Sequence, residues 1–96
     1  MAADSAQSQP LETLLGKIIV IDTASPYVYL GELTGVTDVS VELTNADCHD
    51  LRDSLTSREK YVMDCRLHGV NPNRKKAWVR MADIVGWCLL DDVIVE

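Results

Sequence analysis

The chain has 96 residues, which is enough for one domain and excludes a multidomain enzyme. Hydrophobic residues make up 47% of it and charged residues 25%, ordinary globular values that exclude a disordered or low-complexity chain. Its net charge of -6 argues against a protein that coats nucleic acid through overall attraction to phosphate. Because a domain this small is only marginally stable alone, we expect it to associate with itself.

The charges are unevenly distributed along the chain. Residues 52–80 hold eight of the nine basic residues and three acidic ones, a net +5, whereas the rest, with one base and twelve acids, is -11. Such a basic segment commonly pairs with acidic neighbours within or between subunits, and the alternative is a phosphate-binding surface. Both interpretations stay open from the sequence.

The cysteines and the first residues bear on the compartment. Three cysteines are too few and too unevenly spaced for a secreted disulfide framework. The start of the sequence lacks the charged and apolar regions of a secretory signal, and no apolar run approaches the roughly 18 residues that span a bilayer. We therefore expect a soluble, cytoplasmic protein with no membrane partner.

The first half of the chain predicts a tail, a helix and three strands. Residues 1–9 are small and polar, so we expect a flexible tail. Residues 10–15 predict a short helix, with proline in the first turn and leucines spaced i, i+3, i+4. Residues 17–22 are typical of a strand buried on both faces, and 27–36 of a second strand. Alternating residues over 39–44 indicate a third, half-exposed strand with Val39 facing inward.

The second half begins with a segment that breaks the strand pattern. Residues 47–53 predict a polar loop. Residues 57–68 predict a capped helix that Gly69 ends, although a strand over 60–67 also fits the alternation and stays open. The rest predicts a turn over 69–76, strands over 77–81 and 84–90, and a possible extension of the sheet over 93–95.

Five short strands, an N-terminal helix and two glycines within the second strand indicate a mainly β fold. Gly31 and Gly35 permit a sharp bend, which lets one strand serve both halves of a closed sheet. The expected architecture is a small five-stranded, strongly bent SH3-like barrel over residues 10–96, with the 57–68 helix as an insertion.

Two motifs resemble those of the Sm and Sm-like (LSm) family. Residues 30–38 (LGELTGVTD) resemble the first motif, in which a bent second strand carries G-x-L-x-G, then an apolar residue and an aspartate. Residues 79–85 (VRMADIV) are similar to the second motif, which carries an arginine before a turn with Asn or Asp. The resemblance covers roughly residues 10–46 and 77–90. It implies a divergent Sm-like barrel in which residues 45–76 form an enlarged loop between the third and fourth strands.

The resemblance also implies how the chain assembles and what it binds. Family members pair the fourth strand of one subunit with the fifth strand of the next around a closed ring, which removes exposed sheet edges. The implied partners are further copies of this chain in a homo-oligomeric ring and single-stranded RNA. Nothing in the sequence indicates a cofactor or a small-molecule substrate.

Candidate RNA-binding residues come from two sources. The resemblance supplies residues of the two motif turns, and the basic run of residues 74–76 is added because its charges can contact phosphates. The full set is Asp38, Ser40, Arg74, Lys75, Lys76, Arg80 and Asp83. The turn after the second strand has no side chain that stacks on a base, unlike the family's usual aromatic, His or Met. This difference favours an alternative, a structural or protein-interaction module that oligomerises without binding RNA.

No residue pattern predicts catalysis. Four side chains can ligate zinc: Cys48, His49, Cys65 and His68. They contain neither a C-x-x-C nor an H-x-x-x-H pair, so ordinary loop residues are favoured over a zinc site. Three carboxylates flank His49 in sequence: Asp47, Asp50 and Asp53. A solvated acidic loop is the simpler interpretation of these than a cation site or a hydrolase. We expect no enzymatic activity, no catalytic or metal site and no cofactor.

Two tryptophans fall on the last two predicted strands. Packing in the core or at a subunit interface is the commoner role of such residues, and a base-stacking platform is the alternative. The sequence leaves the role of Trp78 and Trp87 open.

Overall fold

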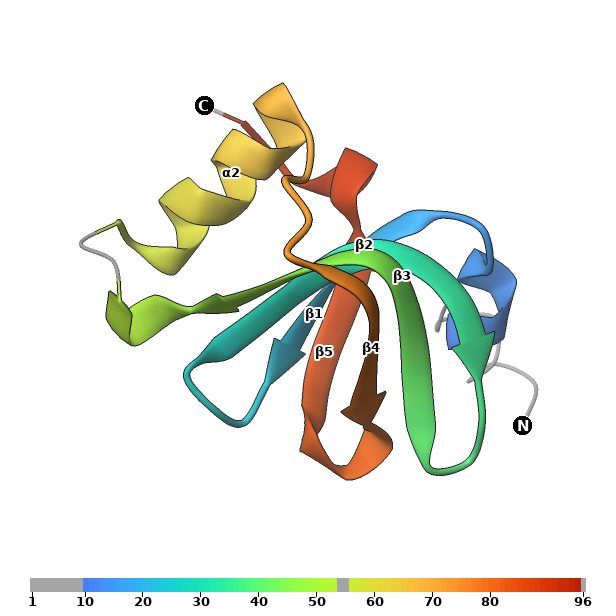
Figure 1. Cartoon of the computed structure of the whole chain (residues 1–96). Coiled ribbons are helices and arrows are strands. Elements are labelled where there is room, and N and C mark those ends of the chain that lie inside the picture. Colours follow the sequence, from blue (N-terminus) through green and yellow to red (C-terminus); the bar gives the residue numbers. More distant parts are fainter. Residues whose placement is uncertain (1–9, 54–55, 96) are drawn as a thin grey trace, which may run out of the picture.

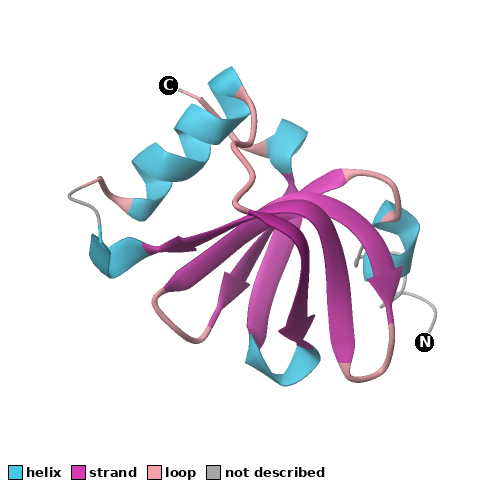
Figure 2. Cartoon of the chain, in the orientation of Figure 1, coloured by secondary structure: helices cyan, strands magenta, loops and turns pink. Residues whose placement is uncertain are grey.

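A computed structural model describes residues 10–53 and 56–95 of the chain, and it contains one bent antiparallel sheet with short helical segments around it (Figure 1 and Figure 2). The strands are β1 (Ile18–Thr23), β2 (Tyr27–Val36), β3 (Ser40–Asp50), β4 (Arg74–Arg80) and β5 (Ile84–Leu89). They are arranged in the order β4-β3-β2-β1-β5, which makes β4 and β5 the two edges. The mainly β, five-stranded, strongly bent fold is confirmed.

The helical segments connect or flank these strands. They are η1 (Leu11–Leu14), η2 (Leu51–Asp53), α2 (Arg58–His68), η3 (Met81–Asp83) and η4 (Leu90–Asp92). Only α2 is an α-helix, so the expected N-terminal helix is a short 3-10 turn. No helix in residues 10–53 and 56–95 has the length and apolar character needed to cross a membrane. The tail expected over residues 1–9 lies outside the described residues.

The bend of the sheet arises where β2 passes β3. Leu30 pairs with Asp47 and Glu32 pairs with Thr44, so β3 has one more residue than β2 between these two pairs, which is a β-bulge. Asn45 lies at this bulge in a left-handed conformation (φ 51°), which Asn adopts more readily than most residues. A Cβ at Gly31 would lie 3.0 Å from the Cα of Ala46. The close approach of the two strands at the bend therefore favours glycine.

Two hydrophobic clusters lie on opposite sides of the sheet. The barrel core contains nine buried residues: Leu11, Leu14, Ile19, Ile21, Leu33, Val41, Leu43, Ala46 and Val79. The second cluster lies between β1, β2 and α2: Val20, Val28, Leu30, Val62, Cys65 and Leu90. Strand β1 contributes to both clusters, as the β-branched run predicts.

Helix α2 has clear start and stop signals. The Ser57 hydroxyl oxygen accepts the backbone N–H of Lys60 at 3.2 Å, and Gly69 (φ 91°) donates its N–H to the carbonyl of Cys65 at 2.8 Å. An ion pair between Arg58 and Asp22 holds the first turn against β1. The helix prediction for this segment is confirmed, and the strand alternative is wrong because the caps and the second cluster both favour a helix.

Several predicted boundaries are wrong. The polar loop expected from residue 47 begins only at 51, because β3 continues in register with β2 as far as the Tyr27–Asp50 pair. The turn expected over 69–76 ends at 73, because β4 starts at Arg74 opposite Ala46. Residues 93–95 are not a strand, and Val39 is 72% exposed in a turn instead of facing inward.

Candidate nucleic-acid interface

Two turns meet at one end of the sheet. The turn of residues 37–39 joins β2 to β3, and η3 joins β4 to β5. Both lie at the lower end of the sheet in Figure 1, away from α2. The N–H of Met81 donates to the carbonyl of Val39 at 2.8 Å, and Ser40 pairs with Arg80 in the ladder. Residues 40 positions apart in sequence are thereby held side by side.

The 37–39 turn is built around one threonine. The hydroxyl oxygen of Thr37 accepts the N–H groups of Val39 at 3.2 Å and Ser40 at 3.1 Å, and its own N–H donates to the Ser40 carbonyl at 2.9 Å. These bonds satisfy the backbone within the turn. Asp38 and Val39 are therefore presented to solvent at the tip.

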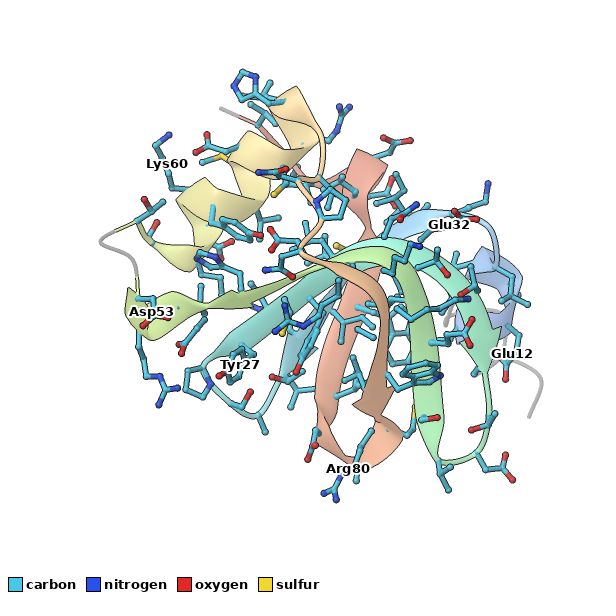
Figure 3. The ribbon with its side chains drawn as sticks, viewed as in Figure 1. Glu12, Tyr27, Glu32, Asp53, Lys60 and Arg80 are labelled. Atoms are coloured by element: carbon cyan, nitrogen blue, oxygen red, sulfur yellow. The ribbon has the colours of Figure 1, made fainter. Side chains whose placement is uncertain are left out.

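Arg80 and Asp83 flank the second turn. The Nε of Arg80 lies 3.3 Å from the Oδ2 of Asp83, and the two side chains are 76% and 51% exposed. Figure 3 shows Arg80 pointing away from the sheet at this end. An ion pair this exposed is weak, so the guanidinium can exchange its carboxylate for another anion. The structure thus brings together four of the predicted residues: Asp38, Ser40, Arg80 and Asp83.

The other three predicted residues lie apart from this end. Arg74 is six residues from Arg80 along β4, a separation of about 20 Å in an extended strand. Arg74 and Lys75 are exposed, and the Nζ of Lys76 donates to the Oε2 of Glu42 at 2.9 Å. The predicted set is therefore two groups, one at the paired turns and one along the edge strand.

The surface between these two groups has its own network. The Oγ1 of Thr34 donates to the Oε2 of Glu42 at 2.6 Å, and this bond together with that from Lys76 lowers the pKa of Glu42. Trp78 pairs with Glu42 across β3 and β4 and is 62% exposed. The predicted set of RNA-binding residues does not include Trp78, although its spacing of two from both Lys76 and Arg80 on a strand places all three on one face.

A separate polar cluster lies beneath α2. The Tyr61 hydroxyl donates to the Asp47 carboxylate, and the rings of Tyr61 and His49 stack with centroids 3.9 Å apart. A groove of about 720 Å³ opens beside them. In the described part of the chain, no three Cys, His, Asp or Glu side chains gather to hold a metal ion. Burial raises the pKa of the neighbouring Cys65 thiol to about 11.

Asp47 makes the stability of this cluster depend on pH. Its burial raises the pKa of the carboxyl, a shift that the charge of His49 opposes. The folded protein therefore holds this proton to higher pH than the unfolded chain does. The resulting stabilisation is complete below the usual aspartate pKa and is lost as pH rises through the raised value.

We expect the urea midpoint of the wild type to fall relative to that of Asp47→Asn as pH rises from about 4 to about 7. Asparagine still accepts the bond from Tyr61 but does not titrate. Chemical unfolding followed by circular dichroism checks this. Parallel curves for the two proteins over the whole range would contradict the assignment of the pH dependence to Asp47.

The bent five-stranded sheet, with its N-terminal helical turn and its two adjoining turns, defines an Sm-like fold. A solved structure described as the Sm protein of Pyrococcus abyssii in complex with a uridine heptamer is similar, with a TM-score of 0.57 and 15% sequence identity. The alignment covers 85% of this chain and 99% of that one. No family model and no curated protein matches the sequence.

Proposed function

We propose that the chain is a divergent Sm-like protein that assembles into a homo-oligomeric ring and binds single-stranded RNA as a cytoplasmic, non-enzymatic scaffold. The connection between β3 and β4, which contains α2, is its enlarged loop. The observation that carries the proposal is the meeting of the 37–39 turn with η3, which places Arg80 and Ser40 together at one end of the sheet.

Assembly is supported by the two edges of the sheet. Strands β4 and β5 each lack a neighbour on one side within the described chain. Strand β5 carries the large exposed apolar side chains Val85 and Trp87, at 68% and 39% exposure. Exposed edges of this kind invite pairing with another chain, and a closed ring in which β4 of one copy pairs with β5 of the next removes both.

RNA binding is supported by the chemistry of the paired turns. Arg80 supplies an exposed guanidinium for a phosphate or a base, and Ser40, Asp38 and Asp83 supply groups that can hydrogen-bond base edges. The similar archaeal Sm protein was solved with a uridine heptamer. We extend RNA binding to this chain on both grounds.

One observation favours a second function, assembly without RNA. The tip of the 37–39 turn carries Val39, 72% exposed, instead of an aromatic side chain, and Arg80 already pairs with Asp83. A ring with these features would bind protein through its outer surfaces. The two functions differ in whether any oligonucleotide binds at low salt.

Arg80→Ala is expected to weaken RNA binding by about 10- to 150-fold, because a charge-assisted hydrogen bond contributes about 1.5–3 kcal/mol. Gel mobility with uridine-rich and adenine-rich oligonucleotides at two salt concentrations measures this. Arg52→Ala is the matched control, since Arg52 is 65% exposed, pairs with Asp50 and lies in η2, away from the paired turns.

Equal losses in the two variants would contradict a site at the paired turns and indicate only general charge attraction. No retardation of either oligonucleotide by the wild type would favour the function without RNA.

A further inference from the structure

The outer face of β3 and β4 carries a regular set of side chains that neither motif accounts for. By the outer face we mean the side away from the barrel core: Ser40, Glu42 and Thr44 of β3, and Lys76, Trp78 and Arg80 of β4. The intervening partners Val41 and Val79, and Leu43 and Ala77, belong to the barrel core or pack against it. The alternation therefore fixes which side chains share this face.

We propose that the outer face of β3 and β4 is a binding platform for single-stranded RNA, in which Trp78 stacks on a base and Lys76 and Arg80 contact the flanking phosphates. The proposal rests on the proposed RNA-binding function. It assigns a second contact surface for RNA, which lies next to the paired turns but consists of side chains of the strands.

Trp78 has the exposure that stacking requires. It is 62% exposed, between two cations that are each two residues away along β4, about 6–7 Å on either side. A base stacked on an aromatic side chain contributes about 1–3 kcal/mol and is tolerated in any sequence, because every base has a π face. An indole between cations on a strand face thus matches both the bases and the charged backbone of a single strand.

Both cations of the platform form ion pairs with carboxylates but remain accessible to a phosphate. Lys76 bonds to Glu42 and Arg80 to Asp83, and all four side chains are at least partly exposed, from 27% for Glu42 to 76% for Arg80. Exposed pairs contribute about 0–1 kcal/mol, so a phosphate can replace either carboxylate. The Glu42 carboxylate is negatively charged near neutral pH and therefore opposes phosphate binding beside Lys76.

The composition of the face favours RNA over a protein partner. It combines one aromatic ring with two cations, the Glu42 carboxylate and the hydroxyl groups of Ser40 and Thr44, which leaves a net positive charge. The exposed apolar side chains Val85 and Trp87 lie instead on the opposite edge strand, β5. Protein interfaces are apolar at their centre, and single-strand binding surfaces combine positive charge with aromatic rings.

Fluorescence isolates the proposed contact, because the chain has only two tryptophans. In Trp87→Phe, Trp78 is the sole tryptophan, and titration with oligouridine or oligoadenine is expected to quench its emission. In Trp78→Phe, the remaining Trp87 is expected to respond little. Trp78→Leu is expected to weaken binding about 5- to 150-fold, the range that the stacking contribution implies, and Trp78→Phe to weaken it less.

A second variant tests the sign of the charge effect. Glu42→Gln is expected to bind the same oligonucleotides more tightly than the wild type, because it removes a negative charge beside Lys76 and keeps an acceptor for Thr34. A merely structural role of this network would give no gain in affinity.

The outcomes separate this proposal from the proposed function. Quenching of Trp78 together with weaker binding by Trp78→Leu at unchanged solution mass supports the platform. RNA binding that depends on Arg80 but neither quenches Trp78 nor weakens in Trp78→Leu overturns the platform alone. A wild type that binds no oligonucleotide overturns both, and dissociation of the assembly by Trp78→Leu makes Trp78 a subunit contact and overturns the platform.

Discussion

Replacing Val85 with lysine is expected to convert the proposed ring into a monomer of 10.7 kDa. Val85 lies on the edge strand β5 and is 68% exposed, so the substitution leaves the barrel core intact. A lysine on an edge strand is a common means of preventing edge-to-edge pairing, because pairing would bring its charge out of water. Light scattering coupled to size exclusion gives the mass directly.

The matched control is Leu67→Lys. Leu67 is 56% exposed on α2, which is not part of either edge of the sheet, and the change adds the same charge at the same kind of surface position. It is expected to keep a discrete mass several times that of the chain. A wild type that is already monomeric would contradict the ring, as would unchanged assembly of Val85→Lys.

Replacing Gly31 with alanine is expected to lower the free energy of unfolding by about 1–3 kcal/mol, the usual cost of forcing an extra group into a packed site. The added Cβ would lie 3.0 Å from the Cα and 3.2 Å from the Cβ of Ala46, and 3.3 Å from the carbonyl oxygen of Thr44. Two of these atoms are backbone atoms at the bulge, so they can move only if the bend of the sheet changes. Urea unfolding at one protein concentration measures the loss.

Gly86→Ala is the control for this substitution. Gly86 also lies on a strand, but a Cβ there meets nothing within 4 Å. We expect its effect to stay within about 0.5 kcal/mol, as for most surface changes. Solution mass should be measured for both variants so that assembly does not enter the comparison. Equal stabilities of the two variants would contradict a packing requirement at the bend.

The candidate site could be predicted from the sequence only in part. The resemblance named Arg80, Asp83, Asp38 and Ser40, and the structure gathers these at the paired turns. The basic run of residues 74–76 suggested Lys76 as a phosphate contact but not its bond to Glu42, because that bond joins residues 34 apart in sequence. The sequence also leaves open whether Trp78 is exposed, because the same alternation of residues fits an edge strand and an inner strand of a sheet.

The features that depend on neighbouring residues could be predicted from the amino-acid sequence. The β-branched run of β1, the glycines in β2, and the Ser57 and Gly69 caps of α2 each act within a few positions of the chain. Backbone conformation, local hydrogen bonds and apolar periodicity are sufficient to specify them. These features led to the correct fold class.

The extent of β3 and β4 and the direction in which their side chains point depend on contacts between distant segments, so they could be read only from the folded protein. Asn45 adds one residue at the bend, so Ala46 enters the barrel core and Asp47 turns toward α2, contrary to a simple alternation from Thr44. The polar residues after the bulge remain in a strand because β2 pairs with them. Strand pairing between distant segments sets register and burial together, and a single extra residue exchanges the two faces of everything that follows it.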